Sequence, residues 1–180
     1  WLPLLALYTG ARLSELGQLR PEDVRRTEEG IAYLDLNDDG EKSLKTESSR
    51  RRVPLHRHLV DLGFLEYVQE QTKANAPQLF PGLSRSTSGQ FGKAWGQWFG
   101  RYKDKVIKIE VDGVMKDFHS FRHTFKDAAR DAGIPEEIHD AITGHAASSI
   151  GRTYGGGAGL ARLKEEIDKI DYGVDQERTG

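Results

Sequence analysis

The chain has 180 residues, of which 37% are hydrophobic and 30% are charged, and it contains no cysteine. This length suffices for one domain with a sizeable core, and the composition fits a soluble globular protein. The lack of cysteine excludes disulfides and thiolate metal sites. The sequence has no signal peptide and no apolar run long enough to span a membrane.

The charge is distributed unevenly around a formal net charge of −2. Residues 1–40 carry four Arg against eight Asp and Glu, whereas residues 42–58 carry six Lys and Arg against one Glu. Residues 101–108 carry four basic residues against one acidic residue. Either basic segment alone would be interpreted as a solvated surface. The sequence also contains groups that can act on a phosphate, described below, and we therefore interpret the two basic segments as surfaces that bind a DNA backbone.

The first segment, residues 1–8, is apolar and predicts a buried helix. Thr9 and Gly10 interrupt it, and Thr9 is a candidate cap for the next helix, in whose first turn we expect Arg12. The core candidates of that helix are Leu13, Leu16 and Leu19. Glu15 lies one helical turn after Arg12, so it either holds the Arg12 guanidinium or is a surface carboxylate.

A small antiparallel sheet is predicted next. Residues 21–24 indicate a short helical turn, and residues 31–36 alternate between apolar and polar as a strand does. Residues 37–40 form a turn that ends in Asp-Gly. Residues 41–46 and 50–55 are the two further strands that we expect.

The middle of the chain is predicted to be helical, with a loop at residues 74–90. Residues 59–73 have helical spacing. A second set of apolar residues with helical spacing is either a base-stacking platform or an apolar core stripe, and we favour the core stripe; it comprises Phe91, Trp95, Trp98 and Phe99. After Gly159, one apolar stripe marks an amphipathic helix; it comprises Leu160, Leu163, Ile167 and Ile170.

The stretch from His119 to Tyr154 holds the candidate chemistry. Ser120 is predicted to cap a helix that Gly133 ends, which places His119 and Arg122 at a helix N-terminus, where an anion is favoured.

A second helix is predicted to open at Pro135 and to end at Gly144, and His145 follows in the turn. Ser148 or Ser149 can cap a third, short helix that carries Tyr154 just before Gly155, Gly156 and Gly157.

A zinc site at His119 and His123 is the weaker alternative, because position 120 is Ser and no H-E-x-x-H motif is present. We therefore predict no metal. We expect His123 either to be packed or to support a catalytic residue from behind, and we expect His56, His58 and His139 to lie on the surface.

Together these motifs carry a resemblance. T-G-A-R-L-S-E-L at positions 9–16, H-x-x-R at 119–122, and a G-H turn whose histidine lies nine residues before Tyr154 resemble the tyrosine recombinases, the phage integrase family. The match runs from Thr9 to about Tyr172. Thr143 and Ala146 are small departures from the family pattern around the G-H turn.

The resemblance implies a mainly α fold with a small antiparallel β-sheet (α+β). It implies a catalytic domain over residues 1–172 and a tail over 173–180, with the amino-terminal core-binding domain absent from this fragment. It also implies a site-specific recombinase that cuts and rejoins DNA through a 3′-phosphotyrosine, without metal, ATP or any other cofactor.

The resemblance also assigns roles to residues. K-T-E-S-S-R-R-R-V-P-L resembles the family hairpin whose lysine reaches the active site, which places Lys45 there; Lys42 competes but lacks the pattern that follows. The implied catalytic set is Arg12, Lys45, His119, Arg122, His145 and Tyr154, supported by Glu15. The candidates for DNA contact are Lys42, Arg50, Arg51 and Arg52.

The implied partner is double-stranded DNA, bound by a homotetramer that forms through the C-terminal helix. In an isolated, monomeric fragment we expect that helix to pack on its own core. A bacterial or phage-encoded protein of the cytoplasm and nucleoid, away from membranes, is expected. Two alternatives stay open: a type IB topoisomerase that relaxes DNA, and a catalytically silent DNA-binding module.

Overall fold

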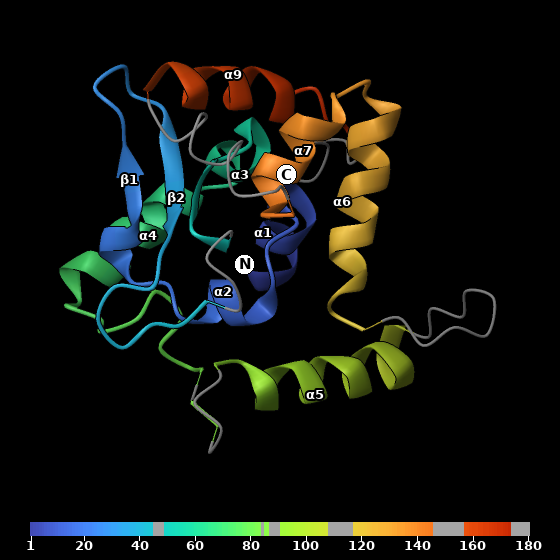
Figure 1. Cartoon of the computed structure of the whole chain (residues 1–180). Coiled ribbons are helices and arrows are strands. Elements are labelled where there is room, and N and C mark those ends of the chain that lie inside the picture. The colour runs from blue at the N-terminus through green and yellow to red at the C-terminus, as the bar shows by residue number, and fades with distance from the viewer. Residues whose placement is uncertain (45–48, 84, 87–90, 108–116, 146–156, 174–180) are drawn as a thin grey trace, which may run out of the picture.

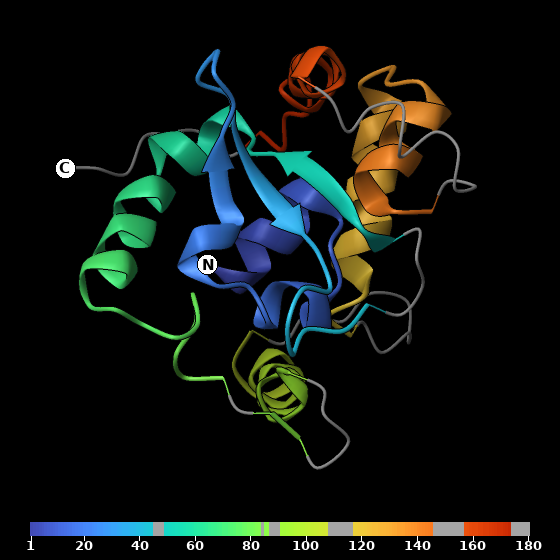
Figure 2. The ribbon, with the colours of Figure 1, turned by 60° about the vertical axis from the view of Figure 1, so that its left-hand side comes forward.

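The computed structural model describes residues 1–44, 49–83, 85, 86, 91–107, 117–145 and 157–173. Helix α1 (Leu2–Thr9) lies at the centre and packs against α2 (Leu13–Gly17), α3 (Arg57–Asp61) and α6 (Ser120–Asp131). A small sheet and further helices surround it (Figures 1 and 2). The predicted fold class, mainly helical with a small antiparallel sheet, is confirmed.

The sheet has three antiparallel strands in the order β1 (Val24–Arg26), β2 (Ala32–Leu36) and β3 (Arg51–Pro54). Two of them match the predicted strands, but β1 replaces the strand predicted at 41–46, since residues 41–44 form none. The side chain of Gln18 explains the difference. It donates to the Ser43 carbonyl and accepts from the Ser43 amide, both at 3.0 Å, so this backbone is satisfied by a side chain.

The connection from α1 to α2 differs from the prediction at Thr9. Thr9 is the last residue of α1, and its hydroxyl donates to the Leu5 carbonyl and accepts from the Ala11 amide. Thr9 therefore does not cap α2. Arg12 occupies the N-cap position, where the Glu15 carboxylate accepts its backbone N–H at 2.8 Å.

The predicted helix over 59–73 is divided into α3 and α4 (Phe64–Lys73) by Gly63, whose φ of 87° is unsuited to other residues. Before α3, η1 (Pro21–Asp23) is the predicted helical turn.

Helix α5 (Lys93–Tyr102) continues into η3 (Lys103–Ile107). The core-stripe interpretation holds for Trp95 and Phe99, which pack on the core, but Trp98 is 49% exposed.

Helices α6 and α7 (Glu136–Thr143) end as predicted, with left-handed glycines at 133 and 144. The predicted Ser120 cap is wrong, because Ser120 is the first helical residue and His119 holds the N-cap position without a side-chain cap bond. The segment of Ser148, Ser149 and Tyr154, for which a third, short helix is predicted, lies outside the described residues.

Helix α9 (Gly157–Ile167) packs on β3 and α7 of its own chain. The predicted apolar stripe is buried, although its last member follows the end of the helix; the four residues are at most 2% exposed: Leu160, Leu163, Ile167 and Ile170. Lys164 donates to the Leu55 carbonyl, and Asp168 accepts from the Arg57 amide at the start of α3. These bonds fix α9 in cis.

The predicted surface histidines are partly wrong. His56 is fully buried, stacks on Tyr8 at 4.4 Å and bonds the Ile170 carbonyl, and this burial lowers its pKa to about 4. His139 is also buried. His123 is exposed and not packed, but its ring lies 5.3 Å from the His119 ring, which fits the second interpretation of this residue. Apolar neighbours that meet only in the folded chain decide these positions.

Candidate active site

Arg12 and Glu15 form the first part of the site, at the start of α2. The Arg12 guanidinium donates to Glu15 Oε1 at 2.6 Å, which confirms the first of the two interpretations of Glu15. Arg12 also donates to Ser49 Oγ at 3.2 Å. Arg12 keeps 23% of its side chain exposed, whereas Glu15 keeps 3%. The buried Glu15 therefore fixes the Arg12 guanidinium, while the exposed part of Arg12 remains accessible to a ligand.

Arg51 of β3 shares the same carboxylate. Its Nη2 lies 2.9 Å from Glu15 Oε2, and both side chains are 3% exposed. Burial alone would raise the pKa of Glu15, but the charge and hydrogen bond of Arg51, followed by Arg12, lower it below 4.5. Arg51 cannot reach a DNA backbone from this position, so its expected DNA contact is not supported.

Arg122 lies in the first turn of α6, and its Nη1 donates to the carbonyls of Gly10 at 2.9 Å and Thr143 at 2.5 Å. Among the described residues, its buried Nη2 has no hydrogen-bond partner. Burial and then the charges of Arg51 and Arg12 lower its pKa to about 10, so it stays charged at neutral pH. A buried cation with an unused donor is suited to an anionic oxygen.

The two candidate histidines are both exposed. Partial desolvation of His119 by its neighbours, followed by the charges of Arg122 and His123, lowers the pKa of His119 below 6.5, so the ring is neutral at neutral pH and can accept a proton. His145 directly follows Gly144, and its amide donates to the Asp140 carbonyl. No group of three or more His, Asp or Glu in the described ranges could hold a metal ion.

Two glycines allow these segments to approach each other. A Cβ at Gly10 would lie 2.8 Å from Thr143 Cγ2, and one at Gly144 would lie 2.9 Å from Arg51 Nη1. Both contacts are too short for any side chain, and both glycines have positive φ. A groove of about 250 Å³ adjoins the site between α2, α5 and the start of α6; its lining includes Arg12, Lys93 and His119.

Lys45 and Tyr154 lie outside the described residues. Of the candidates for DNA contact, Lys42 is buried and paired with Asp23 at 2.6 Å, so its expected DNA contact is also not supported. Arg50 is 56% exposed, although it pairs with Asp38 and Asp39. Arg52 is exposed, with its guanidinium 5.5 Å from the centre of the Tyr33 ring. These two arginines can face a nucleic acid.

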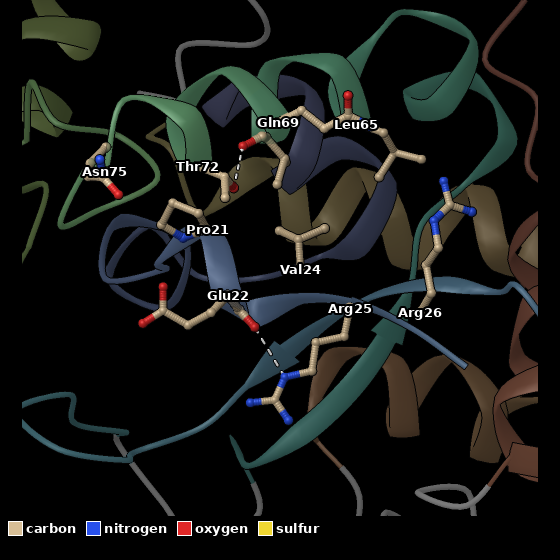
Figure 3. A pocket seen from close by; sticks show the side chains of 11 residues that line it. Pro21, Glu22, Val24, Arg25, Arg26, Leu65, Gln69, Thr72 and Asn75 are labelled. Carbon is tan, nitrogen blue, oxygen red and sulfur yellow. Dashed lines mark hydrogen bonds between the residues drawn. The ribbon is translucent and has the colours of Figure 1, made fainter. Parts of the chain in front are cut away.

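A second groove, of about 590 Å³, lies between α4 and the η1–β1 segment (Figure 3). Leu65 and Gln69 of α4 face Pro21 and Val24 across it. It contains none of the candidate catalytic residues.

A comparison with protein families shows the family of this chain. The sequence model described as the phage integrase family matches residues 2–156. The chain belongs to the phage integrase family. The match agrees with the resemblance of three sequence motifs to the tyrosine recombinases. No helix in the described part of this integrase-family chain is long and apolar enough to cross a membrane.

A solved structure shares the fold of this integrase-family chain. It is the integrase from mycobacterium phage Brujita, with a TM-score of 0.59 and 20% identity. The match covers 94% of this chain but 50% of that protein, so the chain spans about half the length of its structural relative. No curated protein matches the chain.

Sequence reasoning missed Arg51 as part of the site. The signal was present in the alternation of β3, because residues 51 and 53 point to one face while Arg52 points to the other. An arginine in register with the buried Val53 indicates an internal ion pair.

The shared carboxylate yields a prediction about stability. Glu15→Gln keeps the shape but leaves two guanidinium groups with no anionic partner, so unfolding should become easier by about 3–5 kcal/mol. Glu15 has a lowered folded pKa, so its contribution exists above pH 4.5 and is lost as the pH falls through that lower pKa. Chemical denaturation across pH measures both effects, and E15Q should lose this part of the acid dependence.

The matched control is Glu22→Gln, since Glu22 is 64% exposed and lies 3.8 Å from Arg20. This variant should change stability by less than about 1 kcal/mol. Equal effects of the two substitutions would contradict the role of Glu15.

Proposed function

We propose that the chain is the catalytic part of a site-specific recombinase that cleaves and rejoins DNA through a 3′-phosphotyrosine. The observation that carries the proposal is the buried Arg122, whose Nη2 has no hydrogen-bond partner among the described residues, in the electrostatic environment of Arg12 and Arg51. Two guanidinium groups at one site fit the nonbridging oxygens of a phosphodiester. Their fixed donors stabilise the charge that builds on those oxygens in the transition state.

The reaction assigns one task to each group. The Tyr154 oxygen attacks phosphorus and passes its proton to the neutral ring of His119, and His145 donates a hydrogen bond to a nonbridging oxygen. The bond from phosphorus to the 5′-oxygen breaks, and Lys45 gives a proton to that oxygen. The ester energy is kept in the phosphotyrosine, so religation needs no ATP, and the arginines supply the positive charge that a metal would otherwise provide.

The assembly is also part of the proposal. Double-stranded DNA would lie over the arginine site, with Arg50 and Arg52 near its backbone, in a homotetramer of a bacterial or phage-encoded protein that acts on the nucleoid. Exchange of α9 between protomers would have to replace the cis contacts of Lys164 and Asp168. The mass of the synaptic complex in sedimentation tests this, and a DNA-bound monomer at saturating DNA would refute it.

The experiment is cleavage of a nicked suicide substrate by the protein with its own attachment DNA, in excess EDTA. A covalent protein–DNA adduct, together with products in which strands of two separate duplexes are joined, supports a recombinase. Relaxation of supercoiled DNA without joining would favour the type IB topoisomerase alternative. Absence of any adduct despite DNA binding would favour the silent module.

A modified substrate separates the proposed general acid from the phosphate ligands. Sulfur in place of the bridging 5′-oxygen is a leaving group that needs no proton. It should largely restore cleavage by Lys45→Ala but not by Arg122→Ala. Equal responses of the two variants would mean that Lys45 binds phosphate and does not protonate the leaving group.

A further inference from the structure

We propose that Arg51 is a positioning residue, which sets the relative placement of the Arg12 helix and the His145 turn. The inference rests on the proposed function, because it concerns the same site. Arg51 has no role in the chemistry described above, and its burial keeps it from DNA. Arg51 contacts three segments, and each segment lies next to a candidate catalytic residue in the sequence.

The bonds of Arg51 run in three directions. Nη2 donates to Glu15 Oε2 at 2.9 Å, and Glu15 in turn holds Arg12. Nε donates to the Ile142 carbonyl at 2.7 Å, three residues before His145. Nη1 donates to the Ser49 carbonyl at 2.8 Å, at the end of the segment that follows Lys45. One planar guanidinium thus joins α2, the end of α7 and the approach to β3.

Packing leaves this arrangement little freedom. A Cβ on Gly144 would lie 2.9–3.2 Å from three atoms of the Arg51 side chain, so the glycine rests directly on the guanidinium. The side chain is 3% exposed, and Glu15 is equally buried. A buried group whose three nitrogens are each hydrogen-bonded can hold its neighbours to one geometry. Displacement of a phosphate ligand by about 1 Å can cost about 100-fold in rate.

Lysine tests this geometry without removing the charge. In Arg51→Lys the single ammonium can still pair with Glu15, but it cannot reach three acceptors in the directions of a planar fork. We expect single-turnover cleavage of bound suicide substrate to fall about 100-fold, while the affinity for DNA stays nearly unchanged. The pairing with Glu15 should keep the protein folded, which thermal unfolding verifies.

A matched control separates positioning from general loss of stability. Val53→Ala removes buried atoms from the same strand, two residues away, without removing a bond to Ile142 or Ser49. The urea concentration is chosen for each variant so that Val53→Ala and Arg51→Lys have the same free energy of unfolding when cleavage is measured. Val53→Ala should then cleave at nearly the wild-type rate. Equal loss of rate in both variants would overturn the proposal, since Arg51 would then act through stability alone.

A second measurement does not depend on catalysis. Amide hydrogen exchange in Arg51→Lys should rise at residues 12–16 and 142–145, relative to wild type, and stay unchanged in α4. Unchanged exchange at the two site segments would overturn the positioning role. If the wild-type chain forms no covalent adduct, the proposed function fails by itself, and this exchange measurement still decides the role of Arg51.

Discussion

Replacing Tyr154 by phenylalanine is expected to abolish the covalent protein–DNA adduct while leaving DNA binding nearly unchanged. Phenylalanine keeps the ring but has no oxygen to attack phosphorus. The resemblance to the family assigns the role of nucleophile to this tyrosine, which follows the G-H turn. In the proposed function the arginine site binds the phosphate that the tyrosine attacks. Denaturing electrophoresis of a labelled suicide substrate measures the adduct, and titration of intact DNA measures the affinity.

Tyr172 provides the matched control, because it is the other tyrosine near the C-terminal end of the chain. Its hydroxyl donates to the Leu7 carbonyl at 2.7 Å, and its ring packs on Tyr8. Burial, followed by the charge of Tyr8, raises the pKa of Tyr172, so its nucleophilic form is disfavoured. Tyr172→Phe should therefore form the adduct normally. An adduct in Tyr154→Phe, or its loss in Tyr172→Phe, would move the nucleophile to another residue.

Much of the helical framework could be predicted from local signals. Gly10, Gly133 and Gly144 end their helices with positive φ, and Pro135 stands just before α7. These signals act within one or two turns, so they are visible in sequence. The Arg12–Glu15 contact was open to prediction for the same reason, since its partners lie one turn apart.

The errors arise where distant residues override local signals. Residues 41–44 look like a strand, but Gln18 satisfies the backbone of Ser43 and Asp23 pairs with Lys42. His56 looks like a surface group in a basic segment, yet Tyr8 and the Ile170 carbonyl enclose it. Both outcomes depend on segments far away in the chain, which no local pattern reports.

The same distinction applies to the site. The sequence motifs predicted Arg12 and Arg122 as phosphate ligands, but the motif around residues 50–52 could not separate buried from exposed arginines. Burial divides them: Arg51 joins Glu15 inside the protein, whereas Arg50 and Arg52 remain on the surface. In this segment the charge of Arg51 is therefore used in an internal ion pair, and only the charges of Arg50 and Arg52 are accessible to DNA.

Arg122→Lys should reduce cleavage by about 100- to 1,000-fold, which is the cost of removing one fixed donor to a developing oxyanion. Arg122 donates from Nη1 to the carbonyls of Gly10 and Thr143, and within the described ranges its Nη2 has no hydrogen-bond partner. An ammonium cannot hold both carbonyls and also present a second donor in the plane of a phosphate. The loss should appear in the single-turnover rate on bound suicide substrate.

Stability should fall as well, because a carbonyl that loses its buried partner costs about 1–3 kcal/mol. Denaturant titration measures this loss, so that the rate can be compared where the variant is fully folded. The control is Arg130→Lys on the same helix, an exposed residue that pairs with Asp127 at 2.7 Å. That substitution should change neither rate nor stability appreciably. If Arg122→Lys cleaves as fast as Arg130→Lys, a positive charge alone suffices at this position, and the forked geometry of Arg122 is not what activates the phosphate.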